Sequence, residues 1–495
     1  MLLPRASTAL TFAARLSDLG YTVEGVRALL GGVASDALDR DATTPARLLL
    51  RDDHGQLAAA VRLLLLGESM LTDEVERALG PIGDLAGIVE PMGDRVGAVV
   101  EVAPYAVDDF DWLVASDWST GRTGRPTASD HVLGVGGAST MLAQCTVRPA
   151  AERALDVGTG CGIQAFHLAQ HVGEVVATDI SDRCLALAEF NFSMNQVAGD
   201  LRSGSLFEPV ADERFDLIVS NPPFVIASPP TERHDYRDSG LPGDELCGRL
   251  VRGAAKHLAP GGWCQLLANW EIVDGDDWPT SPRSWLADTS LDAWVLQRDV
   301  QDPAAYVETW SRDAGDHRRP DYEQRYEQWL VGLRDRGVVG VGFGLITLRA
   351  GQHDEPIRKF QHAAQPLAQP VGPDIERWFQ AQDELERQPR AAVLMLSLRC
   401  AADVNVVSVA APGAEVAVLT VQRDTGLAWS GEIDPFGVDI LAAADGSRPI
   451  ADVIAEQALL RGLDPASTLA ESVPVVRRLF AEGFLTVLGN DGGGR

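Results

Sequence analysis

Two short segments of the chain combine residue types that could bind a charged ligand and position a reacting group. Residues 154–163 (ALDVGTGCGI) read as an apolar strand followed by a glycine-rich turn, and residues 215–224 (FDLIVSNPPF) as an apolar strand that ends in an amide, two prolines and an aromatic ring. Because glycine has no side chain, backbone N–H groups in the turn can approach a charged ligand closely. The two segments predict a ligand-binding turn and a positioning segment, each at the end of a strand.

The glycine turn contains Gly158, Gly160 and Gly162 in the order G-x-G-x-G. Asp179 ends the next predicted strand, where a carboxylate can accept both hydrogen bonds of a ribose diol. The alternative is that Asp179 only caps that strand. A nicotinamide-binding turn would have glycine or alanine where this chain has Ile163. The pattern therefore favours a ribose-containing cofactor that is not a nicotinamide dinucleotide.

The second segment ends in Asn221, Pro222, Pro223 and Phe224. These four residues could position a substrate whose reacting atom is a planar nitrogen. Such a nitrogen, in an amide or a base amino group, is a poor nucleophile because its lone pair is delocalised. The side-chain oxygen of Asn221 and the carbonyl of Pro222 could each accept one of its N–H bonds, and Phe224 can stack on a flat group. The prolines fix the backbone, so we expect catalysis by positioning, without a strong base. The alternative is that the prolines only end a strand.

Together the two segments resemble the N-P-P-[FY] amino-methyltransferase branch of the class I S-adenosylmethionine-dependent methyltransferases, which includes release-factor glutamine and ribosomal RNA base N-methyltransferases. The resemblance extends over about residues 132–348 and implies S-adenosylmethionine as cofactor, with Asp156 at its methionine end and Asp179 at its ribose. The other residues that the resemblance places at the cofactor are Gly136, Ser139, Thr140, Gly158, Thr159, Gly160, Gly162, Ile180, Ser205, Leu206 and Asn221.

At the end of the third strand the chain departs from the pattern of the glutamine methyltransferases. Residues 204–207 read GSLF where relatives commonly have S-D-L-F, so Ser205 stands where an aspartate would meet the adenine. A serine hydroxyl accepts the adenine amine more weakly, or Leu206 packs against the ring and its N–H serves instead. We therefore expect cofactor use, with a weaker hold on the adenine.

Other polar residues around the motifs receive separate predictions. Residues 236–246 (YRDSGLPGDEL) correspond to the segment that relatives carry after N-P-P-[FY], so Tyr236 and Arg237 are candidate substrate contacts, with an ordinary polar loop as the alternative. Asn191 and Asn195, on the helix after the second strand, are interpreted as surface or capping residues.

The alternation of strands and helices predicts an α/β fold with a doubly wound, mostly parallel sheet and an antiparallel last strand. The strands are expected at residues 153–157, 174–178, 215–220, 263–268, 293–300 and 338–348. The resemblance implies a seven-stranded Rossmann-like methyltransferase sheet. We expect three domains: a mostly helical or winged-helix-like module with short strands at 1–125, the catalytic domain at 126–350, and an α+β, winged-helix-like module at 351–495, in which residues 391–399 and 414–422 are read as strands.

Net charge, cysteine spacing and the length of apolar runs argue against several other classes of protein. The 495-residue chain has a formal net charge of −29, which is unfavourable for a protein that binds duplex nucleic acid mainly through phosphates. Its six cysteines form no C-x-x-C pair, so we expect neither a metal site nor a disulfide framework. No apolar run is long enough to cross a bilayer, and the N-terminus lacks the pattern of a secretion signal. We expect a cytoplasmic protein with no membrane partner.

The resulting hypothesis is an enzyme that methylates a planar nitrogen, either a nucleobase amino group or a protein glutamine amide. The helical leader and the acidic charge favour glutamine, whereas the phenylalanine of the motif and the two flanking modules favour RNA. Two alternatives stay open. The acceptor could be a peptide or natural product docked by the C-terminal module, or the chain could be a non-catalytic protein that binds S-adenosylmethionine.

Overall fold

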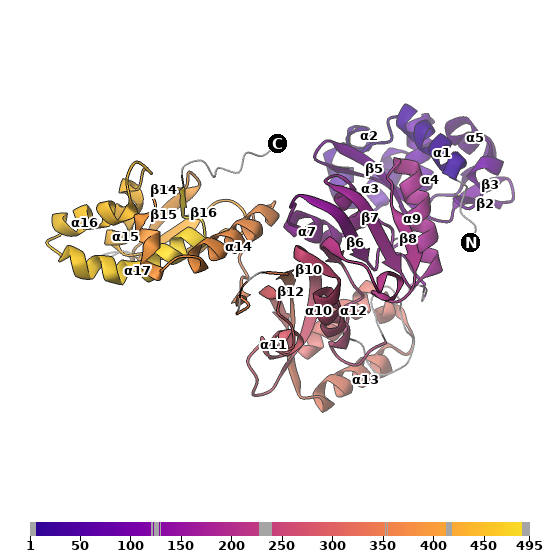
Figure 1. Cartoon of the computed structure of the whole chain (residues 1–495). Helices are drawn as coiled ribbons and strands as arrows, with labels where there is room; N and C mark the ends of the chain where they lie inside the picture. Colours follow the sequence, from indigo (N-terminus) through magenta and orange to yellow (C-terminus); the bar gives the residue numbers. More distant parts are fainter. Residues whose placement is uncertain are drawn as a thin grey trace. The chain divides into compact units, whose positions relative to one another are not determined.

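The computed structural model describes residues 6–119, 122, 128, 130–226, 240–351, 353, 355–411 and 418–487. The chain forms two compact units, of which the first comprises Met1–Ala143 and Ala150–Ala364 and the second Gln144–Pro149 and Gln365–Arg495. The first unit therefore contains the predicted N-terminal module and the predicted catalytic domain except for residues 144–149 (Figure 1).

The N-terminal part of the first unit combines helices with short strands. Its helices are α1 (Ala6–Asp18), α2 (Val23–Leu38), α3 (Thr44–Leu49), α4 (Gln56–Leu64) and α5 (Thr72–Leu79). Its strands are β1 (Met70–Leu71), β2 (Val89–Met92), β3 (Arg95–Ala98), β4 (Glu101–Val107) and β5 (Phe110–Ser116). Strands β1, β3 and β2 form one antiparallel sheet, and β4 pairs with β5 in a hairpin.

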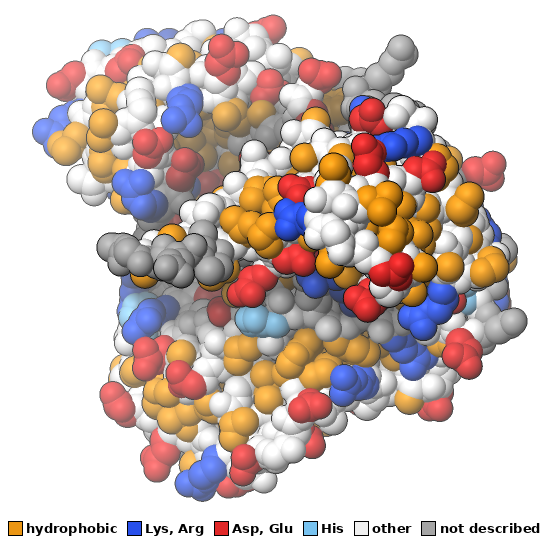
Figure 2. All heavy atoms as spheres, turned by 90° about the vertical axis from the view of Figure 1, so that its left-hand side faces the viewer, with side chains coloured by type: hydrophobic (Ala, Val, Ile, Leu, Met, Phe, Trp, Pro, Cys, Tyr) orange, Lys and Arg blue, Asp and Glu red, His pale blue; other side chains and the backbone are white. Residues whose placement is uncertain are grey.

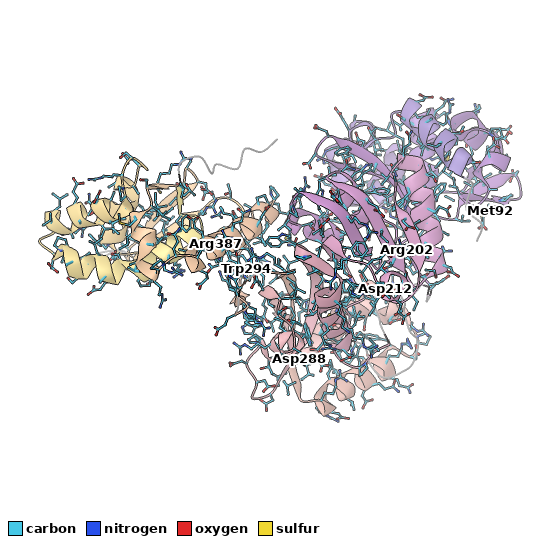
Figure 3. The ribbon with its side chains drawn as sticks, in the orientation of Figure 1. Met92, Arg202, Asp212, Asp288, Trp294 and Arg387 are labelled. Carbon is cyan, nitrogen blue, oxygen red and sulfur yellow. The ribbon has the colours of Figure 1, made fainter. Side chains whose placement is uncertain are left out.

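An eight-stranded sheet dominates the first unit, in the order β13-β11-β12-β10-β9-β6-β7-β8 (Figure 1). The strands are β6 (Ala151–Val157), β7 (Val172–Asp179), β8 (Asp200–Ser203), β9 (Phe215–Ser220), β10 (Leu258–Val273), β11 (Asp292–Gln301), β12 (Val338–Arg349) and β13 (Arg358–His362). Strands β6 to β10 pair in parallel, and β12 is antiparallel to both of its neighbours. The expected α/β class, the mostly parallel sheet and the antiparallel strand at 338–348 are confirmed. In Figure 3, Arg202 marks β8 at one edge of this sheet and Trp294 marks β11 near the other.

Helices connect the strands of this sheet. They are α7 (Gly137–Cys145), α8 (Ile163–Ala169), α9 (Asp182–Asn195), α10 (Glu245–His257), α11 (Thr280–Leu286), α12 (Pro303–Asp313) and α13 (Tyr322–Asp335). Buried residues of the strands and of α10 and α11 form one hydrophobic core, which includes Leu155, Ile218, Val251, Leu266 and Val295. Burial of this apolar surface fixes the strand ends that carry the two motifs.

The sheet has one strand more than the seven expected, because the chain returns to it after residue 350. A buried ion pair precedes this strand: Oδ2 of Asp292 accepts from Nη2 of Arg349 at 2.8 Å, and the two side chains are 1% and 8% exposed. The other carboxylate oxygen of Asp292 accepts from the backbone N–H of Ile357 at 2.8 Å. These contacts hold the segment that precedes β13, and β13 pairs in parallel with β11.

Asn191 lies inside the first unit, so the interpretation of it as a surface or capping residue is wrong, whereas Asn195 is half-buried at the end of α9. Asn191 is fully buried. Its amide oxygen accepts from the N–H of Ala115, and its amide nitrogen donates to the carbonyls of Ala115 and Cys161. Asn195 makes the same paired contact with the backbone of Leu113. The two amides join α9 to β5, and Asn191 also reaches the glycine turn.

The second unit contains α14 (Gly372–Glu386), β14 (Leu398–Cys400), β15 (Val404–Val409), β16 (Val418–Arg423), β17 (Ser430–Glu432), α15 (Pro435–Ala443), α16 (Ile450–Leu460), α17 (Pro465–Ala481) and β18 (Leu485–Val487). The strand expected at 391–399 is mostly wrong, because Arg390–Met395 forms a 3₁₀ helix and only β14 pairs, with β18. Figure 2 shows apolar side chains gathered on the face of this unit toward the viewer. Its exposed apolar residues include Leu459, Leu460, Leu463 and Val475.

Candidate active site

The carboxyl ends of β6, β7, β8 and β9 surround one cavity of about 260 Å³. Ligands of doubly wound sheets bind in such a position. The residues expected at the cofactor or acceptor that line this cavity are Ser139, Gly158, Thr159, Gly160, Asp179, Ile180, Ser205, Leu206, Asn221, Pro222 and Pro223. The fold therefore brings most of the two predicted motifs to one hollow.

The glycine turn keeps its backbone in the left-handed region, with φ values of 76°, 56° and 91° at Gly158, Gly160 and Gly162. A Cβ at Gly162 would lie 2.8 Å from the ring of Phe192, so this glycine allows α9 to pack closely. A Cβ at Gly158 or Gly160 would meet no atom within 4 Å. At these two positions the missing side chain leaves open space beside the backbone, which suits a ligand that lies against the turn.

Asp156 lies fully buried behind the turn and does not line the cavity. Its Oδ2 accepts a hydrogen bond from Oγ1 of Thr159 at 2.7 Å. Its Oδ1 has no hydrogen-bond partner among the residues that the structure describes. Burial raises the pKa of Asp156 to about 7, although the bond from Thr159 opposes this shift. A buried carboxyl with one unpartnered oxygen suits a nearby positive group, on which it would act through its charge.

Asp179 is half-buried at the end of β7, and two backbone groups hold its carboxylate. The N–H of Gly160 donates to Oδ2 at 3.0 Å, and the N–H of Ser181 donates to Oδ1 at 2.8 Å. Burial raises its pKa, and these hydrogen bonds oppose the rise. Each oxygen keeps a second lone pair, so the side chain can still accept from two hydroxyls, as a ribose diol requires.

Ser205 and Leu206 line the cavity at the end of β8. Leu206 has a φ of 50°, a conformation that is uncommon for a residue with a side chain. Its carbonyl accepts from Oγ1 of Thr178 at 3.2 Å. Such strained residues concentrate at ligand sites, and this one lies where the resemblance places the adenine.

Asn221, Pro222 and Pro223 line the cavity after β9, at the end where the acceptor nitrogen is predicted, called the acceptor end below. Nδ2 of Asn221 donates to Oγ of Ser139 at 3.4 Å, which leaves its side-chain oxygen as an acceptor. The carbonyl of Pro222 already accepts from the N–H of Phe224 at 2.7 Å and keeps one lone pair. The ring of Phe224 is not among those that line the cavity; it meets Trp310 edge to face, with centroids 6.1 Å apart.

A buried hydrogen-bond network, which the sequence analysis missed, holds the backbone just after this segment. The hydroxyl of Tyr306 accepts from the N–H of Ile226 at 2.8 Å and from Nδ2 of Asn269 at 3.1 Å. Nε1 of Trp329 donates to the carbonyl of Ile226 at 2.9 Å. Tyr306 is fully buried. The only sequence signal is an aromatic residue between two predicted strands, and that signal does not identify its hydrogen-bond partners.

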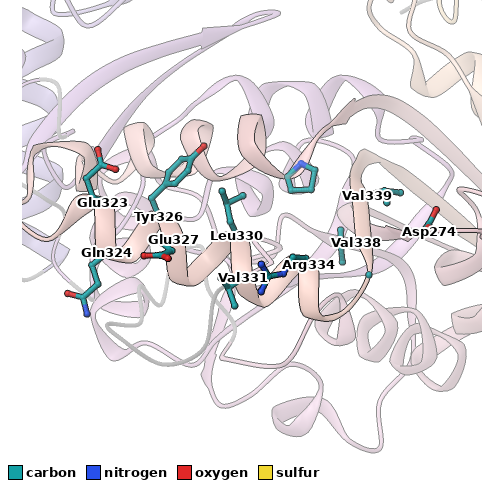
Figure 4. A pocket seen from close by; sticks show the side chains of 12 residues that line it. Asp274, Glu323, Gln324, Tyr326, Glu327, Leu330, Val331, Arg334, Val338 and Val339 are labelled. Atoms are coloured by element: carbon teal, nitrogen blue, oxygen red, sulfur yellow. The ribbon is translucent and has the colours of Figure 1, made fainter.

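The remaining site predictions have different outcomes. Gly136 and Thr140 line a neighbouring groove instead of the cavity. Tyr236 and Arg237 lie outside the residues that the structure describes. A separate hollow of about 1020 Å³ along α13 shares no residue with either motif (Figure 4).

Within the described part of the chain, no group of three or more His, Cys, Asp or Glu side chains could hold a metal ion. A helix long and apolar enough to span a bilayer is likewise missing from that part.

Three family models match successive parts of the chain. Residues 133–273 match the methyltransferase small domain. Residues 18–99 and 376–487 match two domains of unknown function, DUF7059 and DUF7782.

Curated relatives match the same central region. The ribosomal protein uL3 glutamine methyltransferase of Bradyrhizobium diazoefficiens is 35% identical over 187 residues, which cover 34% of this chain and 57% of that protein. The release factor glutamine methyltransferase of Geobacter sulfurreducens is 37% identical, over 23% of this chain and 44% of that protein. The ribosomal RNA small subunit methyltransferase C of Klebsiella pneumoniae is 36% identical, over 24% of this chain and 31% of that protein. The chain thus spans between 31% and 57% of the length of these relatives.

Among solved structures, the T. thermophilus 16S rRNA N2 G1207 methyltransferase in complex with AdoMet and guanosine is 17% identical and covers 52% of this chain and 67% of that chain. Its TM-score of 0.28 supports no conclusion. The match to the methyltransferase small domain includes the glycine turn, Asp179 and the N-P-P-F segment. Residues 133–273 therefore match the methyltransferase small domain, and the curated relatives of this region are glutamine and ribosomal RNA methyltransferases, as the resemblance of the two motifs implied.

Proposed function

We propose that the protein transfers the methyl group of S-adenosylmethionine to a planar nitrogen, either of a protein glutamine amide or of a nucleobase. The observation that carries this proposal is that Asn221 and its two prolines line the same cavity as the glycine turn and Asp179. One hollow thus combines a ribose acceptor, open space beside a glycine backbone and an amide oxygen free to accept an N–H bond.

The residues present fit this cofactor. Asp179 would hold the ribose through its two remaining lone pairs, and the cavity beside Ser205 and Leu206 would take the adenine. The buried charge of Asp156 would attract the ammonium group of the methionine end. The bound cofactor supplies an electrophilic methyl group on a sulfonium.

The acceptor nitrogen would be positioned by hydrogen bonds alone. Its N–H groups would donate to the side-chain oxygen of Asn221 and to the free lone pair of the Pro222 carbonyl. These two bonds would hold the nitrogen in line with the methyl group and lower the entropy cost of the reaction. The nitrogen loses its proton to water after the transfer, so no side-chain base is needed.

The names of the relatives point to ribosomal proteins, release factors and ribosomal RNA as substrates of those proteins. We propose that this protein acts on a protein or RNA of the same translation machinery, and hence in the cytoplasm.

Titration calorimetry with S-adenosylhomocysteine is the first test, and we expect it to detect binding. Radiolabelled S-adenosylmethionine is then added with the protein to a lysate, which is divided between nuclease and protease. Loss of the label to one of these treatments identifies RNA or protein as the acceptor. Binding without any label transfer would instead make the chain a non-catalytic cofactor-binding protein, and absence of binding would contradict the whole proposal. The Asn221→Ala variant is the matched control, because it should bind the product and transfer no label.

A further inference from the structure

A groove of about 880 Å³ lies beside the cofactor cavity, within the first unit. Its lining combines residues of α2 and β4 of the N-terminal part with residues 133–137, Thr140 and the end of α12. His131, Leu133 and Gly134 line both the groove and the cavity. The two hollows therefore share a border.

The groove adjoins the acceptor end of the cavity. Gly136 and Thr140 line it on either side of Ser139, whose hydroxyl accepts from Asn221. Arg312 also lines the groove, two residues after Trp310, the residue whose ring contacts Phe224. A chain lying in the groove would thus contact sequence neighbours of Ser139 and Trp310, the two residues that touch the ends of the N-P-P-F segment.

The lining carries charges of both signs. Its basic residues are Arg27, Arg122, Arg312 and Arg318, and its acidic residues are Asp39, Asp41, Glu101, Asp117 and Asp313. The carboxylates would repel a phosphate backbone, which requires a basic surface. A polypeptide can carry side chains of both signs and can match such a lining. The formal net charge of −29 for the whole chain likewise disfavours binding of a phosphate backbone.

Arg122, which lines the groove, has unsatisfied hydrogen-bond donors. Its side chain is only 10% exposed, and its Nη2 lies 3.1 Å from Oε1 of Glu101. Its Nε lies 3.6 Å from Oδ1 of Asp41, too far for a hydrogen bond. Among the residues that the structure describes, Nε and Nη1 have no hydrogen-bond partner. Buried unpaired donors are costly, and carbonyl or carboxylate oxygens of a bound chain would satisfy them.

We propose that this groove docks a polypeptide segment that presents its acceptor nitrogen to Asn221, so that the substrate is a protein. The inference rests on the proposed methyl transfer and adds the class of acceptor and the surface that binds it. Side chains of the N-terminal part and of α12 would recognise the segment, and Arg122 would bind its oxygens.

The test reverses one exposed charge of the lining on α2 and one on α12, with the double variant Arg27→Glu and Arg312→Glu. The control is Arg334→Glu on α13, which lies outside the groove (Figure 4). The three side chains are 59%, 68% and 74% exposed, and each pairs with one nearby carboxylate at 3.1 to 3.3 Å. The three substitutions therefore disturb the fold to a similar extent.

Label transfer from radiolabelled S-adenosylmethionine is measured over a dilution series of lysate. We expect the label to be lost to protease and kept under nuclease. The double variant should need about tenfold more lysate for half-maximal rate, while its maximal rate and its affinity for S-adenosylhomocysteine stay within twofold. The control should match the unmodified protein in all three quantities.

Two results would overturn the docking proposal while leaving methyl transfer intact. They are loss of the label to nuclease, and equal lysate requirements for the double variant and the control. The unmodified protein, the double variant and the control could all bind S-adenosylhomocysteine and yet transfer no label. In that case the proposed function itself fails, and the docking proposal fails with it.

Discussion

The cofactor side and the acceptor side of the cavity differ in how far apart their contacts lie along the chain. On the cofactor side, Thr159 contacts Asp156 across 3 positions, and Gly160 contacts Asp179 across 19. On the acceptor side, Asn221 contacts Ser139 across 82 positions. The backbone that follows is held by Tyr306 and Trp329, which lie 80 and 103 positions from Ile226.

The two sides of the cavity therefore depend on different parts of the fold. One strand, one turn and the next strand complete the cofactor side, so its geometry is largely local. The acceptor side needs α7, α12 and α13 to be packed before Asn221 and Ile226 are held. We therefore expect substitutions on the two sides to separate cofactor binding from turnover.

The largest effect is expected for Asn221→Ala. The variant removes an oxygen that would accept the acceptor N–H, so turnover should fall by about 10²–10³-fold, as on loss of a transition-state hydrogen bond. The affinity for S-adenosylhomocysteine, measured by calorimetry, should stay within twofold. If binding and turnover are lost together, the residue is structural and the positioning role is wrong.

Asp179→Ala tests the cofactor side. The loss of a carboxylate that accepts from a ribose diol should weaken S-adenosylhomocysteine binding by about 10- to 100-fold, in line with hydrogen bonds to a charged group. The rate at saturating cofactor should change less. Asp182→Ala, at an exposed position on α9, is the control and should leave the affinity unchanged. An unaltered affinity in Asp179→Ala would refute the ribose contact.

Asp156 should make cofactor binding depend on pH. Burial raises its pKa to about 7. As the pH falls through this value the carboxyl takes up a proton and loses the charge that attracts an ammonium group. Calorimetry should therefore find S-adenosylhomocysteine binding about tenfold weaker at pH 6 than at pH 8. Asp156→Asn should abolish this dependence, and a slope that persists in this variant would assign it to another group.

The smallest effect is expected for Tyr306→Phe, which keeps the buried ring and removes its hydroxyl. Loss of this acceptor leaves the N–H of Ile226 unpaired, at a cost of about 1 kcal/mol, which corresponds to a roughly fivefold lower maximal rate if the N-P-P-F segment shifts. Cofactor affinity should not change, whereas KM for the acceptor should rise. Tyr322→Phe on α13 serves as the control. A lower melting temperature with normal kinetics would leave Tyr306 a purely structural role.

The sheet shows which strands an apolar pattern can reveal. The six central strands, β6, β7, β9, β10, β11 and β12, coincide with the strands predicted from the sequence. The edge strand β13 has the sequence RKFQH and was not predicted, and β8 (DLRS) was implied only by the resemblance. Edge strands are buried on fewer sides, so their residues need not be apolar. Their pairing depends on contacts such as Asp292 with Ile357.

The sequence by itself indicated the methyltransferase small domain and the residues of both motifs, because glycine turns, strand-end carboxylates and N-P-P-F depend on local backbone geometry. It could not place Phe224, whose ring contacts Trp310 instead of lining the cavity, nor the buried amide of Asn191. Only the tertiary structure decided that Tyr306 and Trp329 hold the acceptor segment and that a groove of mixed charge adjoins it. The physical reason is that such contacts join residues far apart in the chain, whose meeting depends on how the helices pack around the sheet.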